Sequence, residues 1–387
     1  MLSKPMRTGD KEPTVAIFGA DDRTSACPAL RLGLPLQRAE WPIRWGTSLE
    51  KGHLTVDPAA AHGADIVVVQ RNFPAAATYT SLRKIAALGL PVIYDLDDAI
   101  FHIGPGHRQY AHYKGYFPYV RWMLRQADLI TVSTQPLAEA ISQHTSRPIA
   151  LQPNIVDFAL FDAQPRVRGS RCNLLVSGTP THRADWEIIE PVLSDLLATR
   201  ADELKLTFFG DLPDKFRGHP AVEAIGYEPD YARYAEVIRK LDANFSLVPL
   251  LDSQFNNSKS NIKWLEYSAA GIPGIYSNVE PYSASITGGE DGLLVQNTPE
   301  AWKRAINSLI DNPQRCADLA THARQAVLSR HSLAAGLNKF ESVLRSVVGT
   351  RHVGDKQADL RLAPYRIRTA TRRIIKEQVT RHLCRDK

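Results

Sequence analysis

Residues 256–273 read Asn-Asn-Ser-Lys-Ser-Asn-Ile-Lys-Trp-Leu-Glu-Tyr-Ser-Ala-Ala-Gly-Ile-Pro and are the most informative segment of the chain. It opens with polar residues suited to helix capping and stops at Gly271, before a buried-looking Ile-Pro-Gly-Ile-Tyr strand. This pattern predicts a helix of about three turns. On such a helix Lys259, Lys263 and Glu266 share one stripe. Apolar residues form the neighbouring stripe, so one face packs and the other presents charge; they are Ile262, Leu265 and Ala269.

The charged face of this predicted helix suits a nucleotide-linked sugar. The free amides of a helix start, a hydroxyl such as that of Ser258 and the ammonium group of a lysine make a ready site for a diphosphate. Glu266 lies about two turns deeper and can accept hydrogen bonds from the vicinal hydroxyls of a ribose. The alternative is a core helix on which Lys263 and Glu266 form a surface ion pair of small energetic weight.

Short apolar runs alternate with helical stretches along the first half of the chain. Such runs are typical of strands buried in a parallel sheet, and residues 76–88 and 116–126 are helical candidates between them. The alternation predicts a doubly wound α/β domain over residues 1–157. Its predicted strands are Val15–Phe18, Ile66–Gln70, Pro91–Tyr94 and Leu129–Val132.

A second α/β series follows an irregular linker at residues 158–170, which is rich in Asp, Arg and Pro. We expect a second Rossmann-like domain over residues 171–345 and a basic tail over residues 346–387. Two such units predict a ligand site in the cleft between them, at the carboxyl ends of the strands. The strands predicted for the second domain are Cys172–Ser177, Leu204–Phe209, Ala243–Val248, Gly274–Tyr276 and Gly292–Val295.

Several motifs resemble those of the GT-B glycosyltransferases, in particular the retaining glycosyltransferase family 4, also called group 1. Glu266 matches the second glutamate of that family's Glu-x7-Glu motif, and residues 269–273 are similar to its small-residue run and Gly-x-Pro. Ser258 stands where the family has the first glutamate. Pro153–Asp157 and Asp291–Val295 are similar to two further signatures. The resemblance covers roughly residues 60–345 and implies the GT-B architecture, two Rossmann-like domains facing across a cleft.

The resemblance implies that the second domain binds the donor and that Glu266 holds the ribose. Residues 177–185 are similar to a Gly-Ser-x-Thr-His-x-x-Asp variant of the segment that holds the diphosphate. His182 either contacts phosphate, with Lys259 or Lys263 supplying further positive charge, or merely lies in the first turn of a helix. We expect His182 to be catalytic. The expected donor-binding residues are Gly178, Thr179, Thr181, Ser258, Lys259, Lys263, Glu266 and, near the base, Tyr227.

Carboxylates follow the predicted strand 91–94 directly, at the edge of the sheet that faces a ligand. In GT-A enzymes an Asp-x-Asp motif chelates a metal, whereas the GT-B resemblance implies neither metal nor cofactor, because helix amides and basic residues neutralise the leaving group. We therefore interpret Asp97 and Asp98 as catalytic residues that face the acceptor or the developing sugar cation. Asp95 either binds the acceptor or caps the next turn. Arg71 either binds an acidic acceptor group or pairs with Asp97, and His102 is a further acceptor-binding candidate.

Composition is that of an ordinary globular protein, with 44% hydrophobic and 23% charged residues. No apolar run approaches the roughly 18 residues that span a bilayer, and residues 1–10 lack the apolar core of a secretory signal. We therefore expect a cytoplasmic protein. The four cysteines are scattered and show no Cys-x-x-Cys spacing, which argues against a zinc site or a disulfide framework.

The net charge of +6 is concentrated at the carboxyl end, where residues 351–387 hold eleven Lys/Arg against four Asp/Glu. Residues 364–383 can form a basic helix with a weak apolar stripe, which suits the anionic inner face of a plasma membrane. A solvated tail is the alternative. Nucleic-acid binding is not expected, because basic and aromatic residues are not interleaved and no known module is present.

Together these features predict a glycosyltransferase that moves a sugar from a nucleotide-sugar donor to a bacterial glycan or lipid-linked saccharide. A retaining outcome is implied by the resemblance alone. Two alternatives stay open. One is a catalytically silent subunit that binds a nucleotide-sugar, because the first glutamate and the family's Arg and Lys are missing. The other is a GT-B-fold sugar-nucleotide epimerase, which would need no acceptor.

Overall fold

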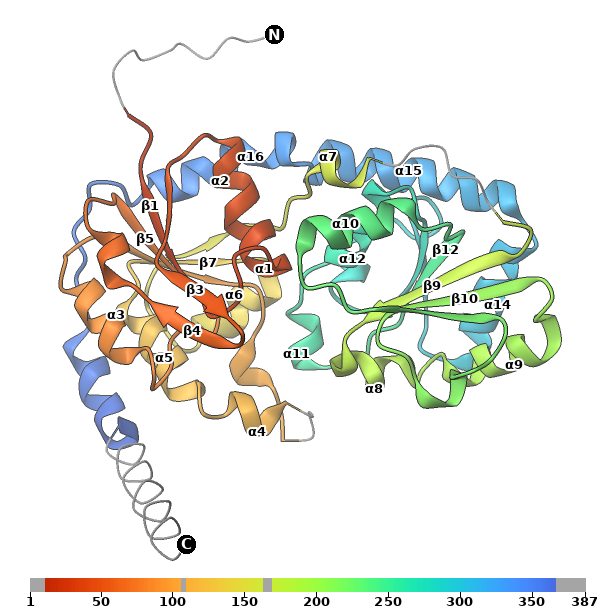
Figure 1. Ribbon diagram of the computed structural model, residues 1–387, viewed down its shortest axis with the longest axis horizontal. Helices are drawn as coiled ribbons and strands as arrows, with labels where there is room; N and C mark the ends of the chain where they lie inside the picture. The colour runs from red at the N-terminus through yellow and green to blue at the C-terminus, as the bar shows by residue number, and fades with distance from the viewer. Residues whose placement is uncertain (1–10, 106–108, 163–168, 367–387) are drawn as a thin grey trace, which may run out of the picture.

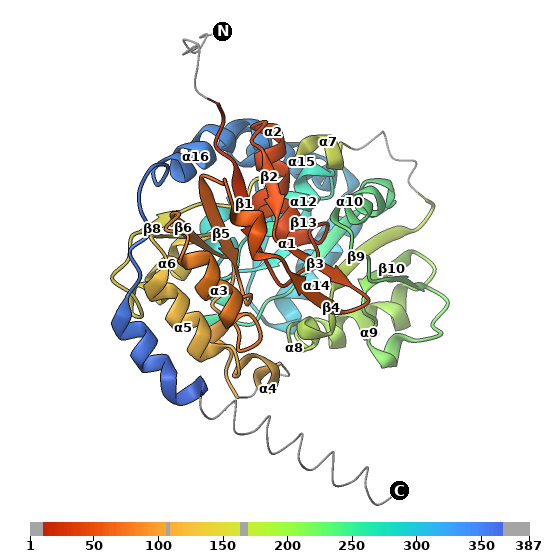
Figure 2. The same cartoon turned by 60° about the vertical axis from the view of Figure 1, so that its left-hand side comes forward.

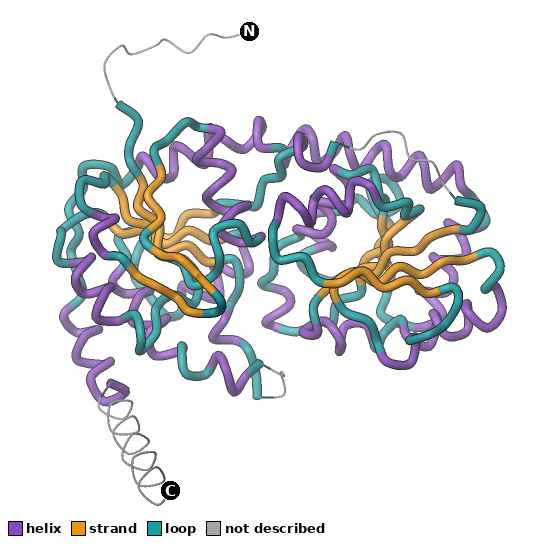
Figure 3. The backbone as a smooth tube through the Cα atoms, in the orientation of Figure 1, coloured by secondary structure: helices purple, strands orange, loops and turns teal. Residues whose placement is uncertain are grey.

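The protein consists of two α/β lobes that lie side by side (Figure 1). The computed structural model describes residues 11–105, 109–162 and 169–366. Within those residues each lobe holds one parallel sheet of six strands, with helices packed around it (Figure 3). The prediction of two Rossmann-like units is therefore confirmed.

The sheet of the amino-terminal lobe is built from the apolar runs that predicted it. Its strands follow the order β2-β1-β5-β6-β7-β8, and all neighbouring pairs are parallel. Because helices cover both faces, β1 and β5 are buried along their whole length. The elements are β1 (Val15–Phe18), α1 (Ala26–Pro28), η1 (Ala29–Gly33), α2 (Leu34–Arg38), β2 (Ile43–Trp45), the hairpin β3 (Thr47–Glu50) and β4 (His53–Val56), η2 (Pro58–Ala61), β5 (Ile66–Gln70), α3 (Tyr79–Ala86), β6 (Val92–Leu96), η3 (Ile100–His102), α4 (Tyr110–Tyr113), α5 (Phe117–Gln126), β7 (Leu129–Val132), α6 (Gln135–Ser142) and β8 (Ile149–Leu151).

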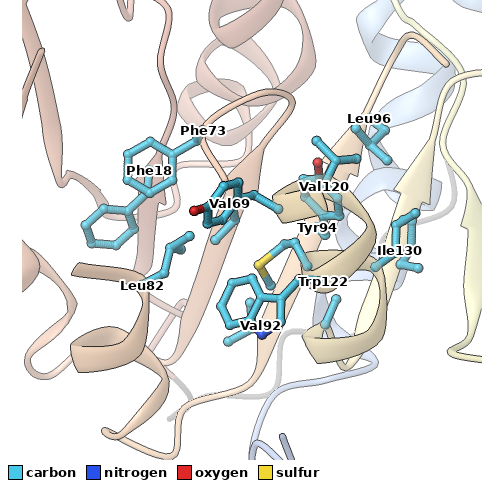
Figure 4. Packing of buried hydrophobic residues seen from close by; sticks show 14 of the residues in the cluster. Phe18, Val69, Phe73, Leu82, Val92, Tyr94, Leu96, Val120, Trp122 and Ile130 are labelled. Atoms are coloured by element: carbon cyan, nitrogen blue, oxygen red, sulfur yellow. The ribbon is translucent and has the colours of Figure 1, made fainter. Parts of the chain in front are cut away.

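Apolar side chains hold this sheet on both of its faces. One face packs against α3 and α5, where Val69 and Tyr94 of the sheet share a core with Trp122 (Figure 4). The other face packs against α16 (Leu333–Arg345), whose Phe340 and Leu344 belong to the same cluster as Ile17 and Val68. Because all the strands are parallel, their carboxyl ends open on one edge of the sheet.

The carboxyl-terminal lobe repeats this plan. Its parallel sheet has the order β11-β10-β9-β12-β13-β14. The elements are α7 (Phe158–Phe161), β9 (Cys172–Gly178), η4 (Pro180–His182), α8 (Arg183–Trp186), α9 (Glu190–Arg200), β10 (Leu204–Gly210), η5 (Asp214–Phe216), β11 (Val222–Gly226), α10 (Tyr231–Lys240), β12 (Phe245–Val248), α11 (Gln254–Asn257), α12 (Ile262–Ala269), β13 (Gly274–Ser277), α13 (Tyr282–Ser285), β14 (Leu293–Val295), α14 (Pro299–Ile310) and α15 (Pro313–His331).

Two stretches of chain join the lobes and lie side by side. Val156 and Ser332 form a parallel bridge, in which Val156 N donates to His331 O over 2.8 Å and Leu333 N donates to Val156 O over 2.9 Å. After the second stretch, α16 packs on the amino-terminal lobe. The expected carboxyl-terminal domain, residues 171–345, therefore ends too late, because α16 belongs to the amino-terminal lobe. The expected linker, residues 158–170, begins with a helix whose Phe161 is buried in the carboxyl-terminal lobe.

Residues 346–366 also pack on the amino-terminal lobe, although we expected the tail to begin at residue 346. Ala358 and Leu362 are buried in the core beside Trp122, whose Nε1 donates to Asp359 Oδ1 over 2.9 Å. Figure 2 shows this helical segment, in blue, running alongside α5. Of the predicted basic helix 364–383, residues 367–383 lie outside the described part of the chain. Among the described helices, none is long and apolar enough to cross a membrane.

The stretch 256–273 is not one continuous helix. Ser253 caps α11 by accepting a hydrogen bond from Asn256 N, and α11 ends at Asn257. The longer α12 begins only after Asn261, so Lys259 lies in the turn between the two helices. Ser253 therefore caps a short separate helix, and the predicted helix starts later than expected, at Ile262.

Candidate active site

The carboxyl ends of the strands of both lobes meet at a cleft, the place where open α/β sheets bind ligands. A cavity of about 460 Å³ lies there and is lined by residues of both lobes. Arg71 follows β5, and Asp97 and Asp98 follow β6. Lys259 and Lys263 line the opposite wall. Four other predicted residues line the same cavity, namely Thr179, Thr181, His182 and Tyr227.

A second hollow of about 220 Å³ continues this cavity into the carboxyl-terminal lobe. Glu266 and Gly178 line it, and Ala26 of α1 contributes to it from the amino-terminal lobe. The two hollows form one site because five residues line both of them, namely Thr179, His182, Tyr227, Ile262 and Lys263.

Glu266 lies at the inner end of this site, on α12, and only 4% of its surface is exposed. The Tyr234 hydroxyl donates a hydrogen bond to its Oε2 over 2.8 Å. Burial raises the pKa of Glu266 to about 7, although the hydroxyls of Tyr234 and Tyr231 and the charge of Lys263 act to lower it. Glu266 also lines the hollow, so its carboxylate faces a ligand there while Tyr234 holds Oε2.

Two lysines give the wall above Glu266 its positive charge. Lys263 Nζ donates to the Ser177 carbonyl over 2.6 Å, and burial lowers the pKa of Lys263 to about 8. Lys259 lies over the Phe255 ring, with Nζ 4.9 Å from the ring centre, and has no salt-bridge partner among the described residues. Lys263 lies in the first turn of α12, where the helix amides add to the attraction for an anion.

His182 stands between the two hollows and is held by a buried carboxylate. Its Nδ1 donates to Asp185 Oδ2 over 2.9 Å. Burial and the charges of Lys263 and Lys259 lower the pKa of His182 well below its usual range, although Asp185 acts to raise it. The imidazole is therefore neutral at neutral pH, with its proton on Nδ1 and a lone pair on Nε2.

Gly178 lets His182 approach the end of β9. A Cβ atom at Gly178 would lie 2.8 Å from His182 Cδ2, and the residue has a positive φ of 154°. Gly210, at the end of the neighbouring strand, has a φ of 104°, and its Cβ would lie 2.5 Å from the Gly178 carbonyl oxygen. Glycine at 178 thus leaves room for the His182 imidazole, and glycine at 210 leaves room for the backbone of the neighbouring strand end.

The wall formed by the amino-terminal lobe is rich in carboxylates. Arg71, with a positive φ of 49°, places Nε 2.9 Å from Asp97 Oδ1, Nη1 3.1 Å from Asp21 Oδ2 and Nη2 3.1 Å from Asp98 Oδ2. One guanidinium is thus shared by three carboxylates. Burial, and next the neighbouring Asp98, raise the pKa of Asp97 against the effect of Arg71. Of the two alternatives for Arg71, the structure shows the pair with Asp97, and the guanidinium is not free for an acidic acceptor.

Three of the predicted site residues lie outside the cavity. Asp95 is buried beneath it and accepts hydrogen bonds from Arg31 and Thr131, because β6 extends to Leu96 and turns this side chain inward. The Ser258 hydroxyl donates to the Gln254 carbonyl over 3.0 Å, because the turn after α11 directs it back to that helix. The third, His102, packs behind the cleft wall against Phe101 and His144.

Sequence reasoning missed several residues that shape the site. Asp185 lies three residues after His182, so an i, i+3 pair was a usable signal. Tyr234 approaches Glu266 from α10, 32 positions away, and no local pattern marks that contact. Asp21 reaches Arg71 from the loop after β1, and Tyr113 lines the cavity from the end of α4.

Comparison with known proteins agrees with this architecture. Residues 186–342 match the family model Glyco_trans_1_2, described as glycosyl transferase-like. No curated protein matches the chain in sequence. The structure is similar to sucrose-phosphate synthase from Thermosynechococcus elongatus, with a TM-score of 0.65 and 15% identity over 87% of this chain and 99% of that chain.

Two further solved structures have the same fold. HepE from Anabaena, in complex with UDP-glucose, gives a TM-score of 0.59 at 14% identity, over 87% of this chain and 100% of that chain. A glycosyltransferase from Rickettsia africae gives 0.58 at 12% identity, over 88% and 100%. At these identities the likeness shows the fold alone. The fold of the whole chain and the family match of its carboxyl-terminal lobe together confirm the prediction of a glycosyltransferase with the GT-B fold.

Proposed function

We propose that this glycosyltransferase moves a sugar from a nucleoside-diphosphate sugar to a hydroxyl group of a bacterial glycan or lipid-linked saccharide. The observation that carries the proposal is the opposition of two walls across one cavity. Lys259 and Lys263 line one wall, and Asp97 and Asp98 line the other. A donor has an anionic diphosphate at one end of its sugar, and the reacting sugar carbon becomes positive as the diphosphate leaves. This order of charges suits the two walls.

The donor would lie along the carboxyl-terminal lobe. Its diphosphate meets the start of α12, where the Asn261 side chain caps no amide and instead donates to Ser285 Oγ over 3.0 Å. Trp264 N and Leu265 N already donate to the Asn261 carbonyl, so the amides of Ile262 and Lys263 are the ones that an anion could meet. The ribose hydroxyls reach Glu266. Tyr227 is 62% exposed beside both hollows and offers its ring to the base.

The acceptor would lie against the amino-terminal lobe. Three carboxylates and one guanidinium leave an excess of hydrogen-bond acceptors there, which suits the hydroxyl groups of a saccharide. In this role Asp97 and Asp98 orient the acceptor and stabilise the positive charge that develops on the sugar. The lysines opposite them stabilise the departing diphosphate.

A donor screen tests the proposal. The melting temperature of the purified protein is measured with UDP-, GDP- and dTDP-sugars, and the donors that raise it are then incubated with and without saccharide acceptors. We expect one donor class to stabilise the protein and to release its nucleoside diphosphate faster when an acceptor is present. A protein that no nucleotide-sugar stabilises would contradict the proposal.

The same incubation separates the two alternative functions. A silent binding subunit would bind the donor and release no nucleoside diphosphate with any acceptor. An epimerase would convert the donor without an acceptor. The anomeric configuration of the product, read by NMR, tests the retaining outcome that we propose from the family resemblance.

We further propose that transfer needs no divalent metal. The Arg71 guanidinium already lies within 3.1 Å of both Asp97 and Asp98, and two ammonium groups face the expected diphosphate position. Turnover should therefore be unchanged in excess EDTA. A loss that Mg²⁺ or Mn²⁺ restores would overturn this part of the proposal.

We propose that the enzyme works in the cytoplasm, at the inner face of the plasma membrane. Arg361 and Arg366 are exposed on the last described helix, together with Leu360 at 74% and Tyr365 at 47% exposure. Basic and apolar groups side by side suit an anionic lipid surface. Cosedimentation with vesicles that contain phosphatidylglycerol, but not with vesicles of phosphatidylcholine alone, tests this. Removal of residues 367–387 should weaken the binding.

A further inference from the structure

The hydrogen bond between His182 and Asp185 determines which nitrogen of the His182 ring carries the proton at the centre of the cleft. His182 lines both hollows of the site, and its Nε2 has no hydrogen-bond partner among the described residues. Nδ1 is committed to Asp185, whose side chain is only 5% exposed. Because a carboxylate only accepts hydrogen bonds, the shared proton stays on Nδ1, and Nε2 presents a lone pair to the ligand.

The surroundings of Asp185 fix how its two oxygens are used. Oδ1 accepts hydrogen bonds from Leu251 N over 2.9 Å and from Asn256 Nδ2 over 3.1 Å. Oδ2 is thereby left for His182. Burial acts to raise the pKa of Asp185, but the hydrogen bond and charge of His182 and the Leu251 amide lower it overall. Asp185 thus ties the imidazole to the segment that leads to Lys259.

The charges nearby also keep His182 neutral. Lys263 and Lys259 are the charged groups that act against its protonation, and Asp185 is the group that favours it. A neutral Nε2 accepts a hydrogen bond from an O–H group and repels the oxygen of a phosphate, which has no proton to donate. The diphosphate is better served by the two lysines, which are pure donors.

We propose that Asp185 is a positioning residue that holds His182 as a hydrogen-bond acceptor, and that His182 thereby selects a donor whose sugar carries a hydroxyl group at this point. The inference rests on the proposed function and adds a chemical requirement for the donor. A sugar with hydrogen or fluorine in place of that hydroxyl cannot donate to Nε2. Of the two expectations for His182, a phosphate contact is thereby replaced by a sugar contact.

The substitution Asp185→Asn tests the polarity. The two N–H groups that meet Oδ1 require an oxygen there, so the new amide must turn its NH2 group toward His182. His182 Nδ1 then has to accept, and the proton moves to Nε2. The matched control is Asp211→Asn on the same side of the lobe. Asp211 accepts a hydrogen bond from Arg183 Nη2 over 2.9 Å and does not line the cleft.

The first readout needs no turnover. NMR of protein labelled with 15N in its 12 histidines distinguishes protonated from unprotonated ring nitrogens, and the signals of His182 are those lost in His182→Gln. We expect a proton on Nδ1 in the wild type and in Asp211→Asn, and on Nε2 in Asp185→Asn. A wild-type His182 with its proton on Nε2, or an unchanged tautomer in Asp185→Asn, would overturn the proposal.

The second readout uses the donor found in the screen and analogues in which one hydroxyl at a time is replaced by fluorine. For the wild type and the control we expect a loss of at least tenfold in kcat/KM at one position. Asp185→Asn should narrow this loss to less than threefold. If Asp185→Asn does not fold, His182→Gln should reduce the loss in kcat/KM in the same way, because the glutamine amide can both donate and accept a hydrogen bond. Equal losses in wild type and variant would contradict the proposal.

If no donor turns over, the proposed transferase function fails, but this inference can still be tested. The NMR of the His182 tautomer is one test. The other is the calorimetric affinity of the donor compared with that of its fluorinated analogue, called here the fluorinated twin. The twin should then bind at least tenfold more weakly to the wild type. Equal binding of the two would overturn the requirement for a hydroxyl.

Discussion

The substitution Glu266→Gln should stabilise the ligand-free protein relative to the wild type, and this gain should be larger at pH 8 than at pH 5. Burial raises the pKa of Glu266 from 4.5 to about 7. The carboxyl group therefore holds its proton more tightly in the folded than in the unfolded protein. Stability is then lost as the pH rises from about 4.5 through 7, because the unfolded chain binds fewer protons in that window.

The magnitude follows from the two pKa values. The difference between 4.5 and about 7 corresponds to roughly 3 kcal/mol of folding free energy. Glutamine has the same shape, keeps an oxygen for the Tyr234 hydroxyl and carries no charge at any pH. The free energy of unfolding of the variant, minus that of the wild type, should therefore rise by about 2.5 kcal/mol between pH 5 and pH 8, because the rest of the change lies below pH 5. Comparison across pH cancels any constant cost of burying the amide.

Urea unfolding at pH 5, 6, 7 and 8 measures this difference. The control is Glu223→Gln on β11, because the Glu223 side chain is 48% exposed and pairs with Lys205 across 2.8 Å. It shows how much of any pH-dependent difference arises from replacing an exposed glutamate in the same lobe. If the difference for Glu266→Gln does not rise with pH, the Glu266 carboxylate stays hydrated in the folded protein, and its pKa is not raised by burial.

Three further predictions concern binding and backbone. The affinity for the intact nucleotide-sugar, measured by calorimetry, should be greatest between pH 7 and 8, because Glu266 ionises at about 7 and Lys263 loses its proton at about 8. Both phosphates of this ligand are diesters that do not titrate in this range, so Glu266→Gln should abolish the acid limb alone. Lys259→Ala should weaken this binding about fivefold at low salt and less at high salt. The melting temperature should change little, because the ammonium lies over the Phe255 ring but forms no salt bridge among the described residues. Gly210→Ala should lower the free energy of unfolding, measured in urea, by about 3 kcal/mol, because the new Cβ would lie 2.5 Å from the Gly178 carbonyl oxygen. The control Gly218→Ala should lower it by only about 1 kcal/mol, because its Cβ would meet no atom within 4 Å.

The strands were the part of the fold that the sequence predicted best. Runs such as Ile66–Gln70 and Leu129–Val132 agree with β5 and β7 residue for residue, because a strand buried on both faces needs an unbroken apolar run. The packing of α16 and residues 346–366 on the first lobe was not predictable in this way. That contact depends on where Phe340 and Leu362 meet distant side chains, and local periodicity carries no such information.

The candidate site was predictable where its residues follow strands. Asp97, Asp98 and Thr179 lie at strand ends, and parallel strands bring those ends to one edge. Asp95 was assigned wrongly because β6 continues two residues beyond the predicted strand, to Leu96, and the Asp95 side chain is buried within it. The Tyr234 contact with Glu266 links two helices, and only the folded lobe brings them together.

The most direct measurement of the central claim is the calorimetric affinity of the nucleotide found in the donor screen for the wild type, Glu266→Ala and Glu223→Ala. A charged carboxylate that accepts ribose hydroxyls contributes about 2 kcal/mol, so Glu266→Ala should bind roughly thirtyfold more weakly. Glu223→Ala, outside the cleft, should bind as the wild type does. Equal affinities of the wild type and a folded Glu266→Ala protein would contradict the assignment of this cleft to a nucleotide-sugar.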